Sequence, residues 1–116
     1  MKIILVINSM ISRKELISDV IKDSQDVYYF VFDKKHKWSI FHNEKDNNVC
    51  LIIYPEKNKS IEEIKNADLS ILSHVVYESA DFRTIEAKES FKELYKIIQE
   101  KLYDIDQEFD DILEIF

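Results

Sequence analysis

The sequence predicts an α+β fold in which a mostly antiparallel sheet of about four strands packs against helices. Three observations lead to this class. Runs rich in β-branched and aromatic residues, VYYFVF, KWSIF and VCLIIY, are separated by short polar connections. Two S-x-x-E patterns are typical of helix starts. A heptad spacing of apolar residues predicts a long amphipathic helical region at the C-terminal end, so the expected order is β-α-β-β-β-(α)-α-α.

The first half of the chain predicts a strand, a helix and a three-stranded meander. Residues 1–7 form a continuous apolar run, which is typical of a buried strand. Ser12 followed by Glu15 predicts a capping box that opens a helix over residues 12–24. Strands are expected at residues 27–32, 37–41 and 49–54, and the short connections between them favour antiparallel pairing.

Residues 61–78 fit two different structures. Ser60 and Glu63 form the second capping box, directly after a strand that the only proline, Pro55, ends. The apolar residues that follow fit one face of a helix, but the stretch LSILSHVVY also alternates as a fifth strand would. The pattern leaves helix and strand both open here.

The region over residues 83–116 has the most regular pattern in the chain. Its apolar residues are spaced by four and three positions in turn: Phe91, Tyr95, Ile98, Leu102, Ile105, Phe109, Ile112 and Phe116. A single straight helix of this length would extend about 50 Å, whereas a compact domain of this size has a diameter of about 35 Å. We therefore expect the helix to break near residues 104–106, with both pieces packed on the sheet. The alternative is a projecting helix that pairs with another chain.

Length and composition predict one compact domain over residues 1–116 without a linker. A chain of 116 residues can bury about two-thirds of the surface that its unfolded form exposes. The single cysteine, Cys50, lies in an apolar run and has no second cysteine with which to pair. No apolar stretch approaches the ~20 residues of a membrane span. These features predict a cytoplasmic protein that does not interact with membranes.

The chain contains no glycine, and this absence excludes several enzyme classes. Phosphate-binding P-loops, dinucleotide-binding fingerprints and the nucleophile elbow of hydrolases all need glycine, because the backbone must adopt a positive φ or approach a ligand closely. Turns must instead use asparagine and aspartate, which tolerate the left-handed conformation.

The remaining catalytic and metal-binding patterns are weak. His42, Glu44 and Asp46 are residue types that bind divalent metals, but no second group of ligands is evident to complete a site. His36 lies among lysines, and His74 stands alone in an apolar stretch. We therefore expect no catalytic residues, no metal and no cofactor. A metal-dependent enzyme that uses the first three residues is the weakest alternative.

Most of the net charge of −7 lies near the C-terminal end. Residues 101–116 contain one lysine and six acidic residues, which are Asp104, Asp106, Glu108, Asp110, Asp111 and Glu114. Negative charge at the C-terminal end of a helix is unfavourable, and like charges at i and i+4 repel. These residues either solubilise an exposed face or bind a basic protein partner. Trp38 is the candidate aromatic anchor of such an interface, and the acidic charge disfavours nucleic-acid binding.

In size, acidity and lack of a catalytic motif, the chain resembles small acidic immunity proteins of bacterial toxin systems, with no motif in common. The resemblance implies a non-catalytic inhibitor. Such a protein binds a cognate basic, nuclease-type toxin and covers its active site or nucleic-acid groove. Two alternatives remain: a phage anti-defence inhibitor, and a homo-oligomeric structural or regulatory module in which the heptad residues pair helices between chains. The sequence is compatible with a monomer or a homodimer.

Overall fold

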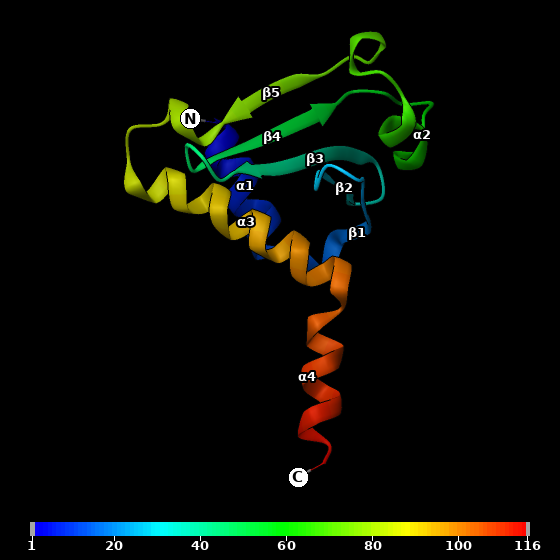
Figure 1. The fold of residues 1–116 in the computed structure, drawn as a ribbon, viewed down its shortest axis with the longest axis vertical. Helices are drawn as coiled ribbons and strands as arrows, with labels where there is room; N and C mark the ends of the chain where they lie inside the picture. The colour runs from blue at the N-terminus through cyan, green and yellow to red at the C-terminus, as the bar shows by residue number, and fades with distance from the viewer. Residues whose placement is uncertain (1, 116) are drawn as a thin grey trace.

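A computed structural model describes residues 2–115 and confirms the α+β class (Figure 1). Five antiparallel strands form one sheet in the order β1-β2-β3-β4-β5. The strands are β1 (Ile17–Lys22), β2 (Tyr28–Phe32), β3 (His36–Asn43), β4 (Asn48–Tyr54) and β5 (Val75–Glu78). The predicted three-stranded meander is β2-β3-β4, and β1 and β5 extend it at its two edges.

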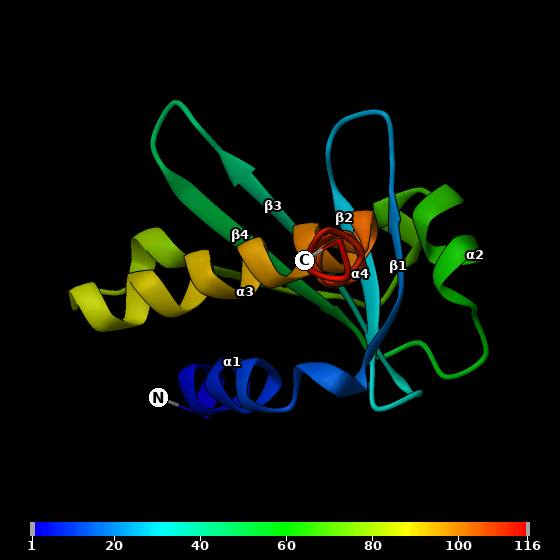
Figure 2. The ribbon, with the colours of Figure 1, turned by 90° about the horizontal axis from the view of Figure 1, so that it is seen from below.

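In the described part of the chain, four helices accompany the sheet: α1 (Lys2–Ser12), α2 (Ile61–Asn66), α3 (Ile85–Tyr103) and α4 (Ile105–Leu113). Helices α1 and α3 lie side by side on one face of the sheet, whereas α2 lies on the other (Figures 1 and 2). Helix α4 projects away from the rest of the molecule. Within residues 2–115, none of the helices combines the length and the apolar character needed to cross a bilayer.

The strand predicted at residues 1–7 is wrong, because Lys2–Ser12 is a helix. Ile3, Ile7 and Met10 are its buried residues, and their spacing of four and three places them on one helical face. A short continuous apolar run does not by itself distinguish a buried strand from a buried helix. The packing of this face against α3 and the sheet selects the helix.

The helix predicted over residues 12–24 is also wrong. Helix α1 ends at Ser12, and Glu15 binds the guanidinium of Arg13 at 2.7 Å instead of closing a capping box. The chain then forms a 3₁₀ turn at Lys14–Leu16 and enters β1. Asp19 adopts a positive φ of 54° in β1, where the register against β2 shifts between Ser18 and Ile21. This bulge hides the strand, because it interrupts the period-two pattern.

Both predicted structures occur within residues 61–78, one after the other. The Ser60 capping box forms: its hydroxyl accepts from the backbone N–H of Glu63 at 3.1 Å, and the Glu63 carboxylate accepts from the Ser60 N–H at 3.2 Å. The helix that it opens ends at Asn66. After a 3₁₀ turn at Leu69–Ile71, the chain pairs with β4 as the fifth strand.

The sheet has a core on each face, because successive side chains of a strand point to opposite sides. The larger core joins the sheet to α1 and α3, and its fully buried members include Ile7, Phe30, Ile40, Leu51, Phe91 and Ile98. The smaller core lies under α2 and contains Ile52, Tyr54, Ile64 and Leu72. Ser39 is buried on this second side, where its hydroxyl bonds that of Tyr54 at 2.7 Å.

Buried Asn48 joins β4 to the 3₁₀ turn at Ser79–Asp81. Its side-chain oxygen accepts from the Ser79 hydroxyl at 3.2 Å and from the Ala80 N–H at 2.9 Å. Its amide nitrogen donates to the Glu78 carboxylate at 3.1 Å. This network fixes the segment that leads from β5 into α3, and so helps to hold α3 against the sheet.

The turns confirm that aspartate and asparagine replace glycine in this chain. Six described residues have a positive φ, and all but Lys34 are aspartate or asparagine: Asp19, Asp26, Asp33, Asn47 and Asp104. Their short polar side chains lower the cost of the left-handed conformation relative to other residues with a Cβ.

Candidate functional site

Helix α4, which we call the C-terminal arm, is separated from α3 by a single residue, Asp104. This residue adopts the left-handed conformation, with φ 51° and ψ 49°, and its N–H bonds the carbonyls of Glu100 and Lys101. A left-handed residue in this position ends a helix, because the chain leaves the helical path there. The break predicted at residues 104–106 is therefore confirmed, and α4 starts in a new direction (Figure 1).

The prediction that both helical pieces pack on the sheet is wrong for the second piece. The heptad positions on α3 are buried or half-buried, with Phe91 and Ile98 fully enclosed. On the arm the same pattern continues into solvent: Phe109 is 57% exposed and Ile112 is 50% exposed. Leu113 and Ile115 are also exposed, whereas Phe116 lies outside the described residues. The arm therefore presents an apolar face that nothing within residues 2–115 covers.

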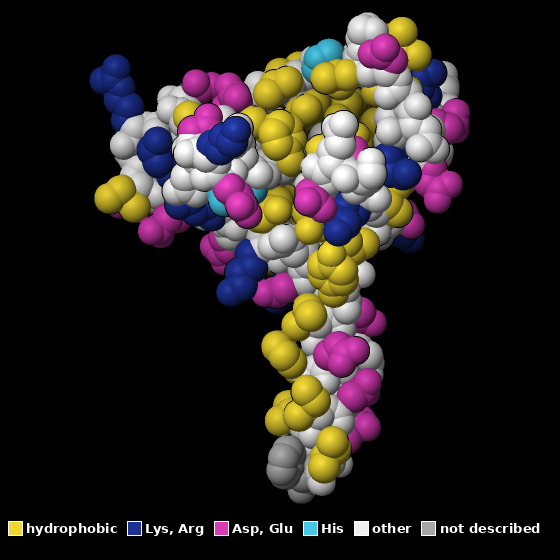
Figure 3. Space-filling model, viewed as in Figure 1, with side chains coloured by type: hydrophobic (Ala, Val, Ile, Leu, Met, Phe, Trp, Pro, Cys, Tyr) yellow, Lys and Arg dark blue, Asp and Glu magenta, His cyan; other side chains and the backbone are white. Residues whose placement is uncertain are grey.

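The predicted acidic residues surround this apolar face. In a helix, residues three and four apart share a face, so Asp106 and Glu108 flank the apolar side. Asp110, Asp111 and Glu114 lie on the opposite side. All six predicted acids, Asp104 included, are exposed. Figure 3 shows hydrophobic side chains along one side of the arm and Asp and Glu along the other.

No basic side chain neutralises these carboxylates in the part of the chain that the structure describes, where the ion pairs are Arg13–Glu15 and Lys22–Asp26. The one side-chain hydrogen bond of the arm runs from the Gln107 amide to Asp111 at 2.8 Å. A nine-residue helix is marginal in water without tertiary packing. The arm has few stabilising contacts of its own and is suited to acquire them from another molecule.

The structure places Trp38 in the core and not on an exposed rim. Only 4% of the residue is exposed, and its indole stacks on Phe30 with ring centroids 6.4 Å apart. Its Nε1 atom is buried and has no hydrogen-bond partner within residues 2–115. An interface anchor on the outer surface therefore cannot use Trp38. Its ring instead forms part of the wall of a groove that the sequence did not predict.

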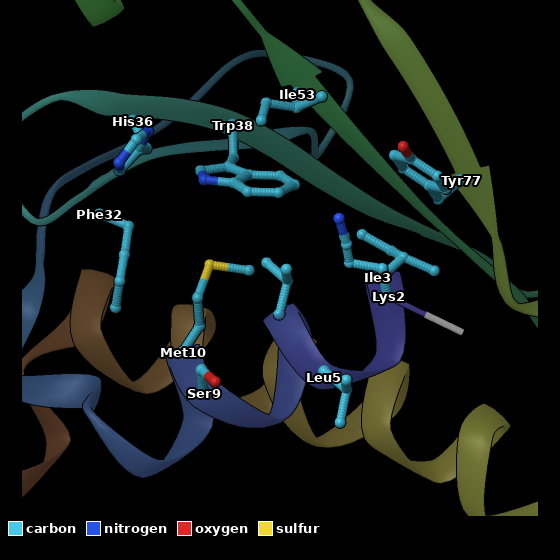
Figure 4. Close-up of a pocket in the computed structure, with 11 residues that line it drawn as sticks. Lys2, Ile3, Leu5, Ser9, Met10, Phe32, His36, Trp38, Ile53 and Tyr77 are labelled. Carbon is cyan, nitrogen blue, oxygen red and sulfur yellow. The ribbon is translucent and has the colours of Figure 1, made fainter.

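This groove, which we call the α1 groove, lies between α1 and the sheet (Figure 4). Its volume is about 660 Å³, and its lining is almost entirely apolar, with Leu5, Val6, Met10, Phe32, Trp38 and Tyr77 among its residues. Leu5 is 68% exposed at the groove. Sequence reasoning missed the groove because it requires α1 to lie across the sheet, whereas residues 1–7 were predicted as a strand.

A basic depression adjoins the α1 groove and shares His36 and Ile53 with it. It is lined by four lysines, which we call the lysine cluster: Lys34, Lys35, Lys37 and Lys57. Lys37 donates to the backbone carbonyl of Glu56 at 2.9 Å, and Glu56 is the one acidic residue of the lining. None of the four lysines forms an ion pair within the described chain. The protein has a net charge of −7, so this cluster is a positively charged patch on a protein that is acidic overall.

The structure does not bring His42, Glu44 and Asp46 together as a metal site. His42 Nε2 bonds the Asn47 side chain at 2.9 Å, and Glu44 and Asp46 are exposed in the turn after β3. Among residues 2–115, no group of three His, Cys, Asp or Glu side chains could hold a metal ion. His36 and His74 are both exposed, and His74 bonds the carbonyl of Leu72.

Cys50 is not an activated nucleophile. Its burial, together with the adjacent Glu78 carboxylate at 3.4 Å, raises the pKa of the thiol to about 12. A reactive cysteine needs the opposite shift, because the thiolate is the nucleophile. The thiol is therefore a small core group.

Comparisons of the chain with protein-family models, with curated proteins and with solved structures gave no match.

Proposed function

We propose that this protein is a non-catalytic inhibitor that binds a basic protein through the carboxylates of its C-terminal arm. The observation that carries the proposal is the arm itself: a projecting helix with exposed acids that no lysine or arginine of the described chain pairs. The acids repel one another and make the helix less stable. A basic partner would convert this cost into attraction, because opposite charges across an interface speed association and fix its register.

The partner that fits best is a nuclease-type bacterial toxin, for which this chain would be the cognate immunity protein. A nuclease binds phosphates in a groove lined by lysine and arginine. Asp110, Asp111 and Glu114, on the outward side of the arm, offer negative charges to such a groove. The arm extends away from the body, which would let it enter a concave active site that a flat surface could not reach. The inhibitor would act in the cytoplasm, where nucleic acid is the substrate to be protected.

Reversal of the three outward acids tests the proposal. The assay measures binding of the basic protein encoded beside this gene by calorimetry at 150 mM salt, together with inhibition of its nuclease activity. We expect the triple variant Asp110→Lys, Asp111→Lys and Glu114→Lys to bind about 100-fold more weakly, because like charges then face each other. Circular dichroism checks that the variant folds, as expected for changes at exposed positions.

A matched control separates local contacts from net charge. Glu62, Glu89 and Glu93 are exposed on α2 and α3, and their reversal to lysine changes the net charge by the same amount. The control should bind almost as well as the natural sequence. If both triple variants lose affinity equally, the arm is not the binding surface.

A phage anti-defence inhibitor would use the same arm against a different basic protein. A neighbouring gene for a large toxin supports immunity, whereas a cluster of early phage genes supports anti-defence. The binding assay is the same with either partner, so only the identity of the protein that is inhibited distinguishes the two.

A further inference from the structure

Two surfaces of this chain lack a partner, and they are complementary. The arm has an exposed apolar face with Phe109 and Ile112 at its centre, flanked by Asp106 and Glu108. The α1 groove has an apolar lining, and the lysine cluster adjoins one end of it. An amphipathic helix that enters a groove with its apolar face inward is a common mode of recognition. The charges beside the two apolar surfaces are of opposite sign.

The arm does not reach the groove of its own chain. It leaves the molecule at the end of α3 and points away from the body (Figures 1 and 2), whereas the groove lies between α1 and the sheet (Figure 4). The principal extents of 50 × 35 × 27 Å reflect this projection. A helix that fills the groove must therefore come from a second molecule.

We propose that the arm of a second copy of this chain occupies the α1 groove. The apolar residues of the arm would lie against Leu5, Val6 and Tyr77, which are accessible or partly accessible residues of the lining, and its flanking carboxylates would approach the lysine cluster. This inference is independent of the proposed inhibitor function. Asp110, Asp111 and Glu114 lie on the side of the arm opposite its apolar face and would stay exposed in the dimer. A docked arm does not project, so an arm that enters the concave active site of an inhibited protein must first leave the groove.

Charge disfavours the simplest rival, a direct pairing of two arms. Each arm carries acids and no base over residues 104–115. Two such helices packed face to face would bring Asp106 and Glu108 of one chain against the same residues of the other, and like charges across a contact are destabilising. The groove offers lysines at the corresponding place.

Exchange of arms between two molecules closes the assembly. Each copy would donate one arm and accept one, which gives a two-fold symmetric dimer with two identical contacts. Because both arms dock, the buried area is twice that of a single nine-residue helix in a groove. Specific interfaces bury at least about 1,200 Å² in total, and the second contact brings the dimer closer to this value.

The mass of the protein in solution is the first test. Sedimentation velocity from 1 to 100 µM should show a dimer for the natural sequence. Phe109→Ser with Ile112→Ser, and separately Leu5→Glu, should each give a monomer, because one removes the apolar face and the other puts a carboxylate at the groove. Ile71→Ser is the matched control: Ile71 is 70% exposed near α2, away from both surfaces, and its variant should remain dimeric. A natural protein that is monomeric at 100 µM overturns the proposal.

Disulfide trapping identifies which surfaces meet. Leu5→Cys and Phe109→Cys are made separately, each with Cys50→Ala, and the two proteins are mixed and oxidised. Arm-in-groove docking predicts a covalent dimer that forms mainly between the two different variants. If Phe109→Cys alone cross-links to itself as fast as it does to Leu5→Cys, the arms pair directly and the groove is not the docking site.

Discussion

Replacing Asn48 with alanine tests the polar network that fixes the path from β5 into α3. The natural side chain accepts two hydrogen bonds, from the Ser79 hydroxyl and the Ala80 N–H, and donates one to Glu78. Alanine would leave these groups without their partner, and a buried polar group that loses its hydrogen bond costs about 1–3 kcal/mol. Ser79 is buried, whereas Glu78 is half-buried and Ala80 is exposed. We therefore expect a loss of about 2–4 kcal/mol.

Urea unfolding followed by circular dichroism measures this loss. With an m-value of about 2 kcal/mol/M for a domain of this size, the midpoint should fall by about 1–2 M. Asn43→Ala is the control, because Asn43 pairs with Asn48 across the hairpin but is exposed and bonds only the backbone of Lys45. Its midpoint should move by less than about 0.5 M. Equal shifts in the two variants would show that the buried network does not stabilise this joint.

Two further predictions concern Cys50 and the heptad positions. The Cys50 thiol has its pKa raised to about 12 by burial and by Glu78, whereas the unfolded thiol ionises near its ordinary value of 9.0. Between these pH values the unfolded chain binds fewer protons, so the thiol makes stability fall as pH rises. Urea midpoints at pH 8, 10 and 11 should therefore fall more steeply for the natural protein than for Cys50→Ser, and parallel profiles would contradict this assignment. Ile98→Ala should cost about 2–5 kcal/mol, because Ile98 is fully buried. Ile112→Ala, on the half-exposed arm, should cost less than about 1 kcal/mol in dilute protein that contains only monomer. Thermal unfolding compares the two, and a large loss from Ile112→Ala in the monomer would mean that the arm packs on its own chain.

Local patterns in the sequence predicted the secondary structure correctly where the whole pattern lies within one element. The strands β2, β3 and β4 and the Ser60 capping box follow from residues close together in the chain, whereas the helix break at Asp104 was predicted from the length of the region against the diameter of a compact domain. The absence of glycine also predicted correctly that aspartate and asparagine take the left-handed turns. These features depend on backbone sterics and short-range hydrogen bonds, which neighbouring residues determine.

Local sequence patterns predicted the wrong secondary structure where the same pattern fits both a helix and a strand. The apolar run at the start of the chain fits a strand and a helix equally, and only its packing against α3 and the sheet selects the helix. The bulge at Asp19 similarly conceals β1. The α1 groove requires residues 2–12 to be a helix, so a prediction that makes residues 1–7 a strand could not have found it.

The sequence alone determined that the C-terminal region carries an apolar stripe with acids around it, because spacing and charge are properties of the residues themselves. Whether that stripe is covered depends on where the helix points after Asp104, and only the tertiary structure decided this. Ile98 of α3 is buried in the core, whereas Ile112, in the same heptad pattern, belongs to the projecting helix α4 and remains exposed. Trp38 shows the converse, since its ring is an exposed anchor in the sequence-based prediction and a core residue in the fold. Burial is set by the elements that lie opposite a side chain, and these come from distant parts of the chain.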